Sequence, residues 1–480
     1  MLDWISVTFS QILKNIDAII FYRIGGDQGI PLIVLWLIGG GLFFTLRMQF
    51  INIRAFKHAI DVILGKYDDP NDEGEVSHFQ AMATALSGTV GLGNIAGVAI
   101  AISFGGPGAA FWMTIAGLLG MSTKFVECTL AQKYRVVNQD GTSIGGPMYY
   151  LSMGLADLGQ KKLGQFLGGM FALFNILAVL GSSSIFQSNQ SQVVVANVIP
   201  FFAQRSWVYG LILVLIVGLV IVGGIQRIAG VAAAIVPTMC GVYFLAGSWV
   251  ILANFTAIPH AISTIIHSAF ALQAMAGGFV GALIQGFRRA AFSNEAGLGL
   301  AAIAHATAKT DEPVREGIVA MLEPFIDTVI ICNMTALVVI ITGVYNNPEF
   351  ATLNGSELTL AAFTTVIDWF PAVLTVCIFL FAFSTMISSS YYGQVCWQYL
   401  FGNRGVIIYK ILFLVGIFVG TVTNPEAVIE FSDAMKITLA FPSLLGAYFL
   451  CGKVATDQAS YMKRLQAGEM FDESPSKVIG

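Results

Sequence analysis

The sequence contains few charged residues. Asp, Glu, Lys and Arg make up 11% of its 480 residues, whereas hydrophobic residues make up 56%. A soluble domain usually carries about a quarter charged residues, so this composition excludes a soluble protein. Apolar runs near the ~20 residues that cross a bilayer recur along the chain. We therefore expect an all-α polytopic membrane protein in contact with the lipid bilayer.

Several functional motifs are also missing. The six cysteines are scattered without a C-x-x-C pair, so we expect neither a disulfide framework nor a zinc site. The sequence has no G-x-x-x-x-G-K-[ST] loop, so it does not predict ATP binding by this phosphate-binding motif. No nucleophile–base set stands out, and the net charge of −4 offers no basic face for nucleic acid. We expect no enzyme, no prosthetic group and no nucleotide or nucleic-acid partner.

Hydropathy and turn signals predict about eleven transmembrane helices. Most of the 24 lysines and arginines fall on one side if the N-terminus is outside and the C-terminus is cytoplasmic. That asymmetry favours this orientation in a plasma (inner) membrane. The predicted spans are 29–46, 79–104, 109–131, 166–198, 208–224, 229–253, 271–290, 317–342, 362–398, 405–422 and 427–450.

The spans after the first divide into two sets of five. Because each set is odd in number, the second set has the opposite orientation, which is the arithmetic of a five-plus-five inverted repeat with one extra N-terminal span. The predicted units are an interfacial amphipathic helix (1–28), the extra span with a cytoplasmic loop (29–78), the first repeat (79–253), an extracellular lid segment (254–270), the second repeat (271–450) and a cytoplasmic tail (451–480).

Each repeat opens on a glycine-interrupted span. The first contains "SGTVGLGNIAG", Ser87 to Gly97, and the second contains "MAGGFVGALIQG", Met275 to Gly286. Matched broken helices in two inverted halves indicate a transport site. Because lipid does not satisfy the freed backbone groups, the two breaks must face protein or a wet cavity.

The first break has the chemistry for an anion and a cation side by side. Freed N–H groups near Leu92 to Asn94 suit a carboxylate. Freed carbonyls near Ser87 to Val90, with the Thr89 hydroxyl and the Asn94 amide oxygen, suit a hard cation. An amino-acid zwitterion with a sodium ion matches that pair. The alternative is close helix packing by small residues such as Gly93 and Gly97.

Sodium is favoured over a proton as the coupling ion. No Asp, Glu, Lys, Arg or His lies between Phe79 and Phe104. Hydroxyls, amides and carbonyls coordinate sodium but do not shuttle protons near neutral pH. Carboxylates elsewhere in the chain leave a proton-coupled mechanism open.

Polar side chains in other spans give further candidates. In 362–398, the hydroxyls of Ser384, Thr385, Ser388 and Ser389 could ligate a cation or bond back to their own helix. In 166–198, Gln187, Asn189 and Gln190 could line a pocket with Phe186 as a lid, or could hydrogen-bond between helices. These alternatives stay open at this point.

Two pairs of charged residues lie four and three positions apart in the later spans. Glu323 and Asp327 share a helix face near the cytoplasmic end of 317–342. Intramembrane carboxylates are functional suspects, and here gating or structural pairing is favoured over substrate contact. Asp433 and Lys436 are expected to neutralise each other.

Four runs resemble the alanine or glycine:cation symporter family, also called the sodium:alanine symporter family. They are "HFQAMATALSGTVGLGNIAGVAIAISFGGPGAAFWM", "GGPMYYL", "FRRAAFSNEAGLGLAAIAHATAKT" and "EPFIDTVIICNMTAL". The resemblance extends from about residue 15 to residue 450. It implies a leucine-transporter-like fold and Na⁺-coupled uptake of alanine or glycine.

The resemblance also implies roles for individual residues. The substrate carboxylate would meet the backbone at Leu92 and Gly93, with Gly91 beside them. One sodium would meet Thr89 and Asn94. A second would meet the carbonyls of Ser87 and Val90 with the span-nine hydroxyls. The pocket would be completed by Ala276, Gly277, Gly278 and Phe279 and closed by Phe279 and Phe186.

Some positions depart from the family pattern. Leu92 stands where members often have threonine, and "ISSSYYGQ" stands where they often have "ISWSYYGE". The first change lies in the expected site and leaves the alanine-versus-glycine preference open. A channel and a proton-coupled symporter or exchanger are the alternative functions. The sequence indicates neither stoichiometry nor oligomeric state.

Overall fold

The computed structural model describes residues 21–470 apart from 25, 27–28, 70, 140, 272–277, 351–352, 354 and 368. The described chain is helical, which confirms the predicted class. Its strands form two short antiparallel pairs. These pairs are β1 (Arg23–Ile24) with β2 (Ile30–Pro31), and β3 (Val136–Val137) with β4 (Ser143–Ile144).

Seven described helices are long and apolar enough to cross a membrane, and three shorter helices are also apolar. They correspond to ten of the predicted spans; the helix in the region of 271–290 is not among them. The exact count of eleven, the inverted repeat and the unit boundaries stay predictions. The seven are His78–Gly105, Gly108–Lys133, Lys161–Val198, Gly224–Ala253, Pro313–Thr342, Pro371–Phe401 and Phe431–Ala467, and the shorter three are Leu32–Arg47, Ser206–Ile221 and Val406–Val422.

The helices up to residue 253 include two π-helical stretches, η1 and η2. In chain order the elements are α2 (Leu32–Arg47), α3 (Ile51–Arg54), α4 (Phe56–Ile63), α5 (His78–Thr89), α6 (Leu92–Gly105), α7 (Gly108–Lys133), α8 (Pro147–Tyr149), η1 (Tyr150–Gly154), α9 (Leu155–Asp157), α10 (Lys161–Ala178), η2 (Val179–Ile185), α11 (Phe186–Val198), α12 (Pro200–Ala203), α13 (Ser206–Ile221) and α14 (Gly224–Ala253).

The remaining elements include a third π-helical stretch, η4. They are η3 (Phe255–Ala257), α15 (Ile258–Phe270), α16 (Gly278–Asn294), α17 (Ala301–His305), α18 (Pro313–Ala320), α19 (Leu322–Pro324), η4 (Phe325–Cys332), α20 (Asn333–Thr342), η5 (Val344–Asn346), η6 (Pro348–Phe350), α21 (Ser356–Thr364), α22 (Phe370–Phe401), α23 (Val406–Val422), α24 (Pro425–Ile437) and α25 (Ala440–Ala467).

Two predicted segments differ from the structure. The interfacial helix 1–28 lies mostly outside the described residues, and its described end contains strand β1. The span 362–398 begins inside a separate helix, α21, and α22 supplies the rest. The predicted lid segment 254–270 is helical, and Trp112 Nε1 of α7 donates to the carbonyl of Ala269 at 3.1 Å.

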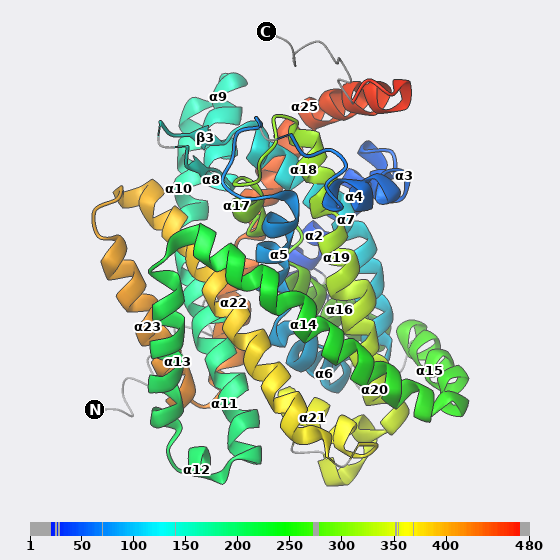
Figure 1. Cartoon of the computed structure of the whole chain (residues 1–480). Helices are drawn as coiled ribbons and strands as arrows, with labels where there is room; N and C mark the ends of the chain where they lie inside the picture. Colours follow the sequence, from blue (N-terminus) through cyan, green and yellow to red (C-terminus); the bar gives the residue numbers. More distant parts are fainter. Residues whose placement is uncertain are drawn as a thin grey trace.

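Helices α5 and α6 lie at the centre of the molecule (Figure 1). A capping box starts α5, since the Ser77 hydroxyl and the Gln80 side chain bond each other's backbone N–H groups. Gly106, with φ of +70°, ends α6 and lets α7 begin two residues later. The most apolar window of α5–α6 is entirely buried, whereas only 33% of that of α14 is buried. The break between α5 and α6 is therefore shielded from lipid.

Candidate functional site

The first predicted break is present. Helix α5 ends at Thr89, α6 begins at Leu92, and Val90 and Gly91 are not helical. The backbone of Gly91 is extended, with φ of −138° and ψ of −151°. The α5 carbonyls and the α6 N–H groups thus end at the same buried point, as glycine punctuation in an uncharged run predicts.

Side-chain amides occupy the N–H groups at the start of α6. The Gly91 N–H donates to Asn94 Oδ1 at 3.0 Å, and the Leu92 N–H donates to Gln187 Oε1 at 3.1 Å. Gln187 comes from α11, directly after the π-helical η2. The helix terminus that suits a carboxylate is therefore reached by a neutral acceptor from another helix.

Within the described residues, the second break lies after α16 and not in the described part of the predicted segment. Helix α16 is continuous from Gly278 to Asn294, so an interruption between Met275 and Gly286 is wrong over its described part. The interruption follows α16, in "EAGLGL" between Asn294 and α17. There Glu295, Gly297 and Gly299 have φ of +59°, +89° and +73°. The positive φ values explain the two glycines.

Close packing explains Gly286, the last glycine of the predicted interruption. A Cβ at Gly286 would lie 2.5 Å from Trp112 Cβ and 2.8 Å from the Ala109 carbonyl, both on α7. Glycine in α16 therefore allows α7 to approach, and it does not interrupt the helix.

The predicted residues at the start of α16 lie away from the first break. Gly93 packs against Ser293, at the other end of α16. At 1.5 Å per residue, Phe279 is about 21 Å along the helix from Ser293, and Gly278 is farther. The Phe279 ring lies 5.5 Å from Trp112 and 6.5 Å from Phe270. Ala276 and Gly277 lie outside the described residues.

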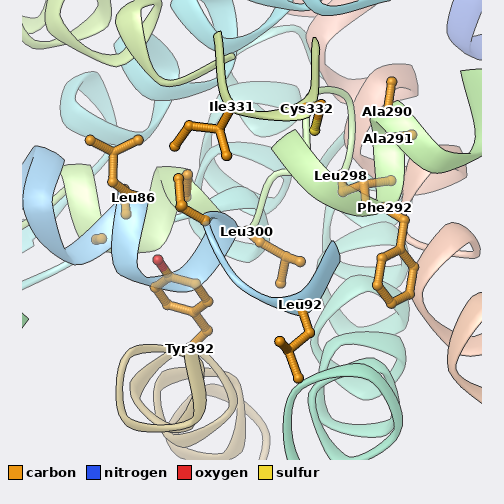
Figure 2. Close-up of a cluster of buried hydrophobic side chains, with 14 of the residues drawn as sticks. Leu86, Leu92, Ala290, Ala291, Phe292, Leu298, Leu300, Ile331, Cys332 and Tyr392 are labelled. Atoms are coloured by element: carbon orange, nitrogen blue, oxygen red, sulfur yellow. The ribbon is translucent and has the colours of Figure 1, made fainter. Parts of the chain in front are cut away.

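Phe292, at the other end of α16, is the described phenylalanine of this helix whose ring contacts Phe186. Its ring centroid lies 5.2 Å from that of Phe186 in an edge-to-face arrangement. Figure 2 shows Phe292 in one buried cluster with Leu92, and with Leu298 and Leu300 of the second break. The two aromatic rings and the two breaks therefore meet in one small region.

Asp327 lies beside the first break. It lies in π-helical η4, and Asn94 Nδ2 donates to its Oδ2 at 2.7 Å. The hydroxyls of Ser293 and Thr328 donate to its Oδ1 at 2.8 Å each. A carboxylate thus links α6 to the end of α16. The expectation of gating or structural pairing over substrate contact stays a prediction for Asp327, and π-helical segments are frequent at functional sites.

Helix α22 carries four buried hydroxyls near the first break, and two of them lie directly against α5 or Gly91. Thr385, Ser388, Ser389 and Tyr392 carry buried oxygens without a hydrogen-bond partner in the described part of the chain. A Cβ at Gly91 would clash with the Thr385 hydroxyl, and one at Gly88 would lie 2.9 Å from Tyr392 Oη. Buried hydroxyls are normally satisfied, so this group is unusual.

Of the remaining predicted residues, Ser87 hydrogen-bonds to another helix, whereas Thr89 and Ser384 hydrogen-bond to their own helices. The Ser87 hydroxyl donates to the Ser384 carbonyl at 2.7 Å, joining α5 to α22. The Ser384 hydroxyl and the Thr89 hydroxyl bond back to their own helices, to Phe381 at 3.0 Å and to Ala85 at 3.1 Å.

Of the three predicted α11 amides, Gln187 is the one that hydrogen-bonds to the break. Gln190 Nε2 donates to Asn189 Oδ1 at 3.3 Å, and Gln190 Oε1 accepts from the Ser356 hydroxyl at 3.3 Å. Asn189 Nδ2 donates to the carbonyls of Gly420 and Thr423 at 2.9 Å each. Gln190 and Asn189 therefore form the interhelical hydrogen bonds of the second alternative.

Buried ion pairs surround the second break. Glu323 pairs with Lys124 at 3.2 Å and with His305, which confirms structural pairing for this residue. The expected Asp433–Lys436 neutralisation is wrong. Asp433 Oδ1 accepts from Arg289 at 2.9 Å, and Lys436 lies 2.9 Å from Glu295 Oε1. Asp433 and Lys436 therefore pair with residues of α16 and of the second break, although they lie only three positions apart on their own helix.

A sequence signal for the second break existed and was missed. Gly91-Leu92-Gly93 at the first break recurs as Gly297-Leu298-Gly299 at the second. The tripeptide places a leucine between two glycines at each helix interruption. Ser293 and Asn294 precede it; the Asn294 amide donates to Thr328 Oγ1 at 2.9 Å and its Oδ1 accepts from the Ala296 N–H at 2.9 Å.

The sequence matches a known family model over residues 12–474, and the model describes the sodium:alanine symporter family. The chain belongs to this family. The relatives are transporters, so the chain is a multi-pass membrane transporter and not an enzyme.

Three curated relatives match along most of their length. The sodium/alanine symporter AgcS of Methanococcus maripaludis is 40% identical over 90% of this chain and 94% of the relative. The probable sodium/glutamine symporter GlnT of Bacillus subtilis is 35% identical over 91% and 89%. The putative sodium/proton-dependent alanine carrier YrbD of the same organism is 36% identical over 84% and 85%.

A solved structure shares the fold. MhsT, crystallised with L-phenylalanine, superposes with a TM-score of 0.55 at 13% identity, covering 78% of this chain and 88% of MhsT. The neighbour supports the leucine-transporter-like architecture that the sequence predicts.

Proposed function

We propose that the chain imports small neutral amino acids, alanine or glycine, together with Na⁺ by alternating access at a site between the two broken helices. The arrangement of the first break carries this proposal. The α6 N–H groups, the buried Asp327 carboxylate and the Thr385 hydroxyl, which has no partner among the described residues, lie where α5 and α6 separate.

The proposal assigns the substrate carboxylate to the Leu92 and Gly93 N–H groups. Gln187 Oε1 accepts from Leu92 N in this structure, and a carboxylate is a stronger acceptor than a neutral amide. Gln187 would turn aside when substrate binds. The substrate ammonium would lie toward Asp327, whose carboxylate is 2.7 Å from the Asn94 amide nitrogen.

The proposal assigns sodium to the contact between α5 and α22. Ligands there would be the carbonyls of Ser87 and Val90 and the hydroxyls of Thr385 and Ser388. Hydroxyl and carbonyl oxygens suit a hard cation, and the Thr385 and Ser388 hydroxyls have no other partner among the described residues. A second sodium near Thr89 and Asn94 is supported less, because both side chains have protein partners.

The Phe186–Phe292 ring pair bears on the size of the substrate side chain. Phe186 and Phe292 lie against each other beside Gly93. We infer that this aromatic pair favours a substrate with a hydrogen or methyl side chain over one with a larger side chain. Scintillation proximity binding of tritiated alanine tests the assignment. We expect binding in sodium but not in potassium, and competition by glycine but not by phenylalanine; binding independent of sodium would contradict it.

A second candidate, proton-coupled symport, is favoured by Asp327. This titratable group lies at the break, where the sequence between Phe79 and Phe104 has none. Uptake under an inward proton gradient without sodium distinguishes the two. Such uptake in the wild type, lost in Asp327→Asn, would support proton coupling. Under sodium coupling the wild type shows none, and D327N lowers sodium-driven uptake about 30-fold or more.

A further inference from the structure

A basic groove with a volume of about 540 Å³ lies at one end of the molecule, between the end of α2, α3 and the last part of α25. Figure 1 shows α3 and the end of α25 at this same end. Three of its lining residues are cationic: Arg47, Arg54 and Lys463. The lining includes no carboxylate among the described residues, and its other polar side chains are neutral.

The charge of the groove is not balanced by neighbouring acids. Asp457 of α25 pairs with Lys133 at 2.5 Å, and Glu312 pairs with Arg464 at 2.6 Å. Among the ion pairs of the described chain, Arg47, Arg54 and Lys463 do not occur. Three exposed cations around one hollow attract an anion of more than one negative oxygen.

The walls of the groove are fixed to each other. Gln458 Nε2 of α25 donates to the Met48 carbonyl at 3.0 Å, directly after α2. His58 of α4 shares a 2.7 Å hydrogen bond with Tyr461 of α25. The Arg54 guanidinium donates to Gln49 Oε1 at 3.1 Å. The groove is thus a built feature of the fold.

Apolar side chains continue from the groove along α2. Leu42 and Leu46 are 50% and 56% exposed on the turns before Arg47, and Phe50 and Ile53 are 47% and 72% exposed after it. Exposed apolar residues that alternate with Arg47 and Arg54 indicate that this region lies at the membrane–water boundary. A soluble anion would have no use for these apolar neighbours.

We propose that this groove binds an anionic phospholipid. Its phosphate would lie among Arg47, Arg54 and Lys463, and its acyl chains would follow Leu42 and Leu46 along α2. Basic pockets at membrane boundaries recognise anionic headgroups in this way. The bound lipid would link α2 and α3 to α25.

Native mass spectrometry of the full chain in detergent tests the proposal. The probes are phosphatidylglycerol and phosphatidylcholine with identical acyl chains. We expect the wild type to retain phosphatidylglycerol preferentially. The variant R47Q/R54Q/K463Q should lose about a hundredfold in phosphatidylglycerol affinity, since each cation near the membrane surface contributes about fivefold, or about 1 kcal/mol.

Two control variants make the test specific. K161Q/K162Q/K309Q removes the same charge from exposed lysines away from the groove and should bind like the wild type. R47K/R54K keeps the charge and should bind within about tenfold. Equal phosphatidylglycerol affinity of the wild type and the triple glutamine variant would overturn the proposal. Displacement of the lipid by equimolar inorganic phosphate would also overturn it, in favour of a soluble anion.

Discussion

Replacing Thr385 by valine tests whether the Thr385 hydroxyl is a sodium ligand or only a structural group. The Thr385 hydroxyl is buried without a partner in the described chain and faces Gly91 at the break. Leaving a buried hydroxyl unsatisfied costs about 1–3 kcal/mol, and valine has nearly the same shape. In potassium, T385V should therefore be at least as stable as the wild type. A variant that removes an ordinary buried hydrogen bond would be less stable.

In sodium, the wild type should be more stable than T385V. A ligand that binds only the folded protein stabilises it by about 2.7 kcal/mol at a concentration a hundred times its dissociation constant. Loss of one ligand that weakens sodium tenfold removes about 1.4 kcal/mol of this gain. Thermal unfolding in detergent, titrated with sodium at constant ionic strength, measures both effects.

Ser390→Ala is the matched control for this experiment. Ser390 lies on the same helix, but its hydroxyl donates to the Ile387 carbonyl at 2.7 Å. We expect S390A to keep the sodium dependence of the wild type. If T385V also keeps it, the Thr385 hydroxyl is not a sodium ligand and the assignment to α22 fails.

Three further predictions concern other parts of the molecule. Gln187→Glu places a fixed anion at the Leu92 N–H and should weaken alanine binding at least tenfold; unchanged binding would contradict the carboxylate assignment. Gly297→Ala, at φ of +89°, should lower stability by about 1–2 kcal/mol, whereas Gly241→Ala, with open space around it, should raise it slightly, both by thermal unfolding. Burial and the Arg315 guanidinium lower the pKa of His58 to about 4, so the unfolded chain takes up the proton first as pH falls below 6.5. Stability should drop by roughly 1–2 kcal/mol between pH 7 and pH 5, and less in His58→Gln; an equal drop in both would refute the assignment.

The first break could be predicted because its cause is local. Glycines and small polar residues interrupt an apolar run that has no charged residue, and such a run is stable in a membrane only if protein surrounds it. The structure buries Leu92 and Asn94 completely. The sequence also predicted the two alternatives for the α22 hydroxyls, because a hydroxyl in an apolar helix needs either a backbone acceptor or a ligand. Ser384 bonds back to its own helix, and a ligand role for Thr385 and Ser388 stays a prediction.

The second break could not be located from glycine content alone. Glycine allows close packing as well as positive φ, and the sequence does not distinguish the two uses. Gly286 serves packing against α7, whereas Gly297 and Gly299 have positive φ. The partners of Asp433 and Lys436 were equally out of reach, because Arg289 and Glu295 are more than a hundred residues away in the chain.

Uptake of radiolabelled alanine into proteoliposomes tests the central claim most directly. The purified protein would face an inward sodium gradient in one experiment and potassium with an inward proton gradient in the other. The account predicts accumulation above equilibrium with sodium alone, abolished when the sodium gradient is dissipated. Accumulation driven equally by protons without sodium would contradict it and would make Asp327 the coupling group.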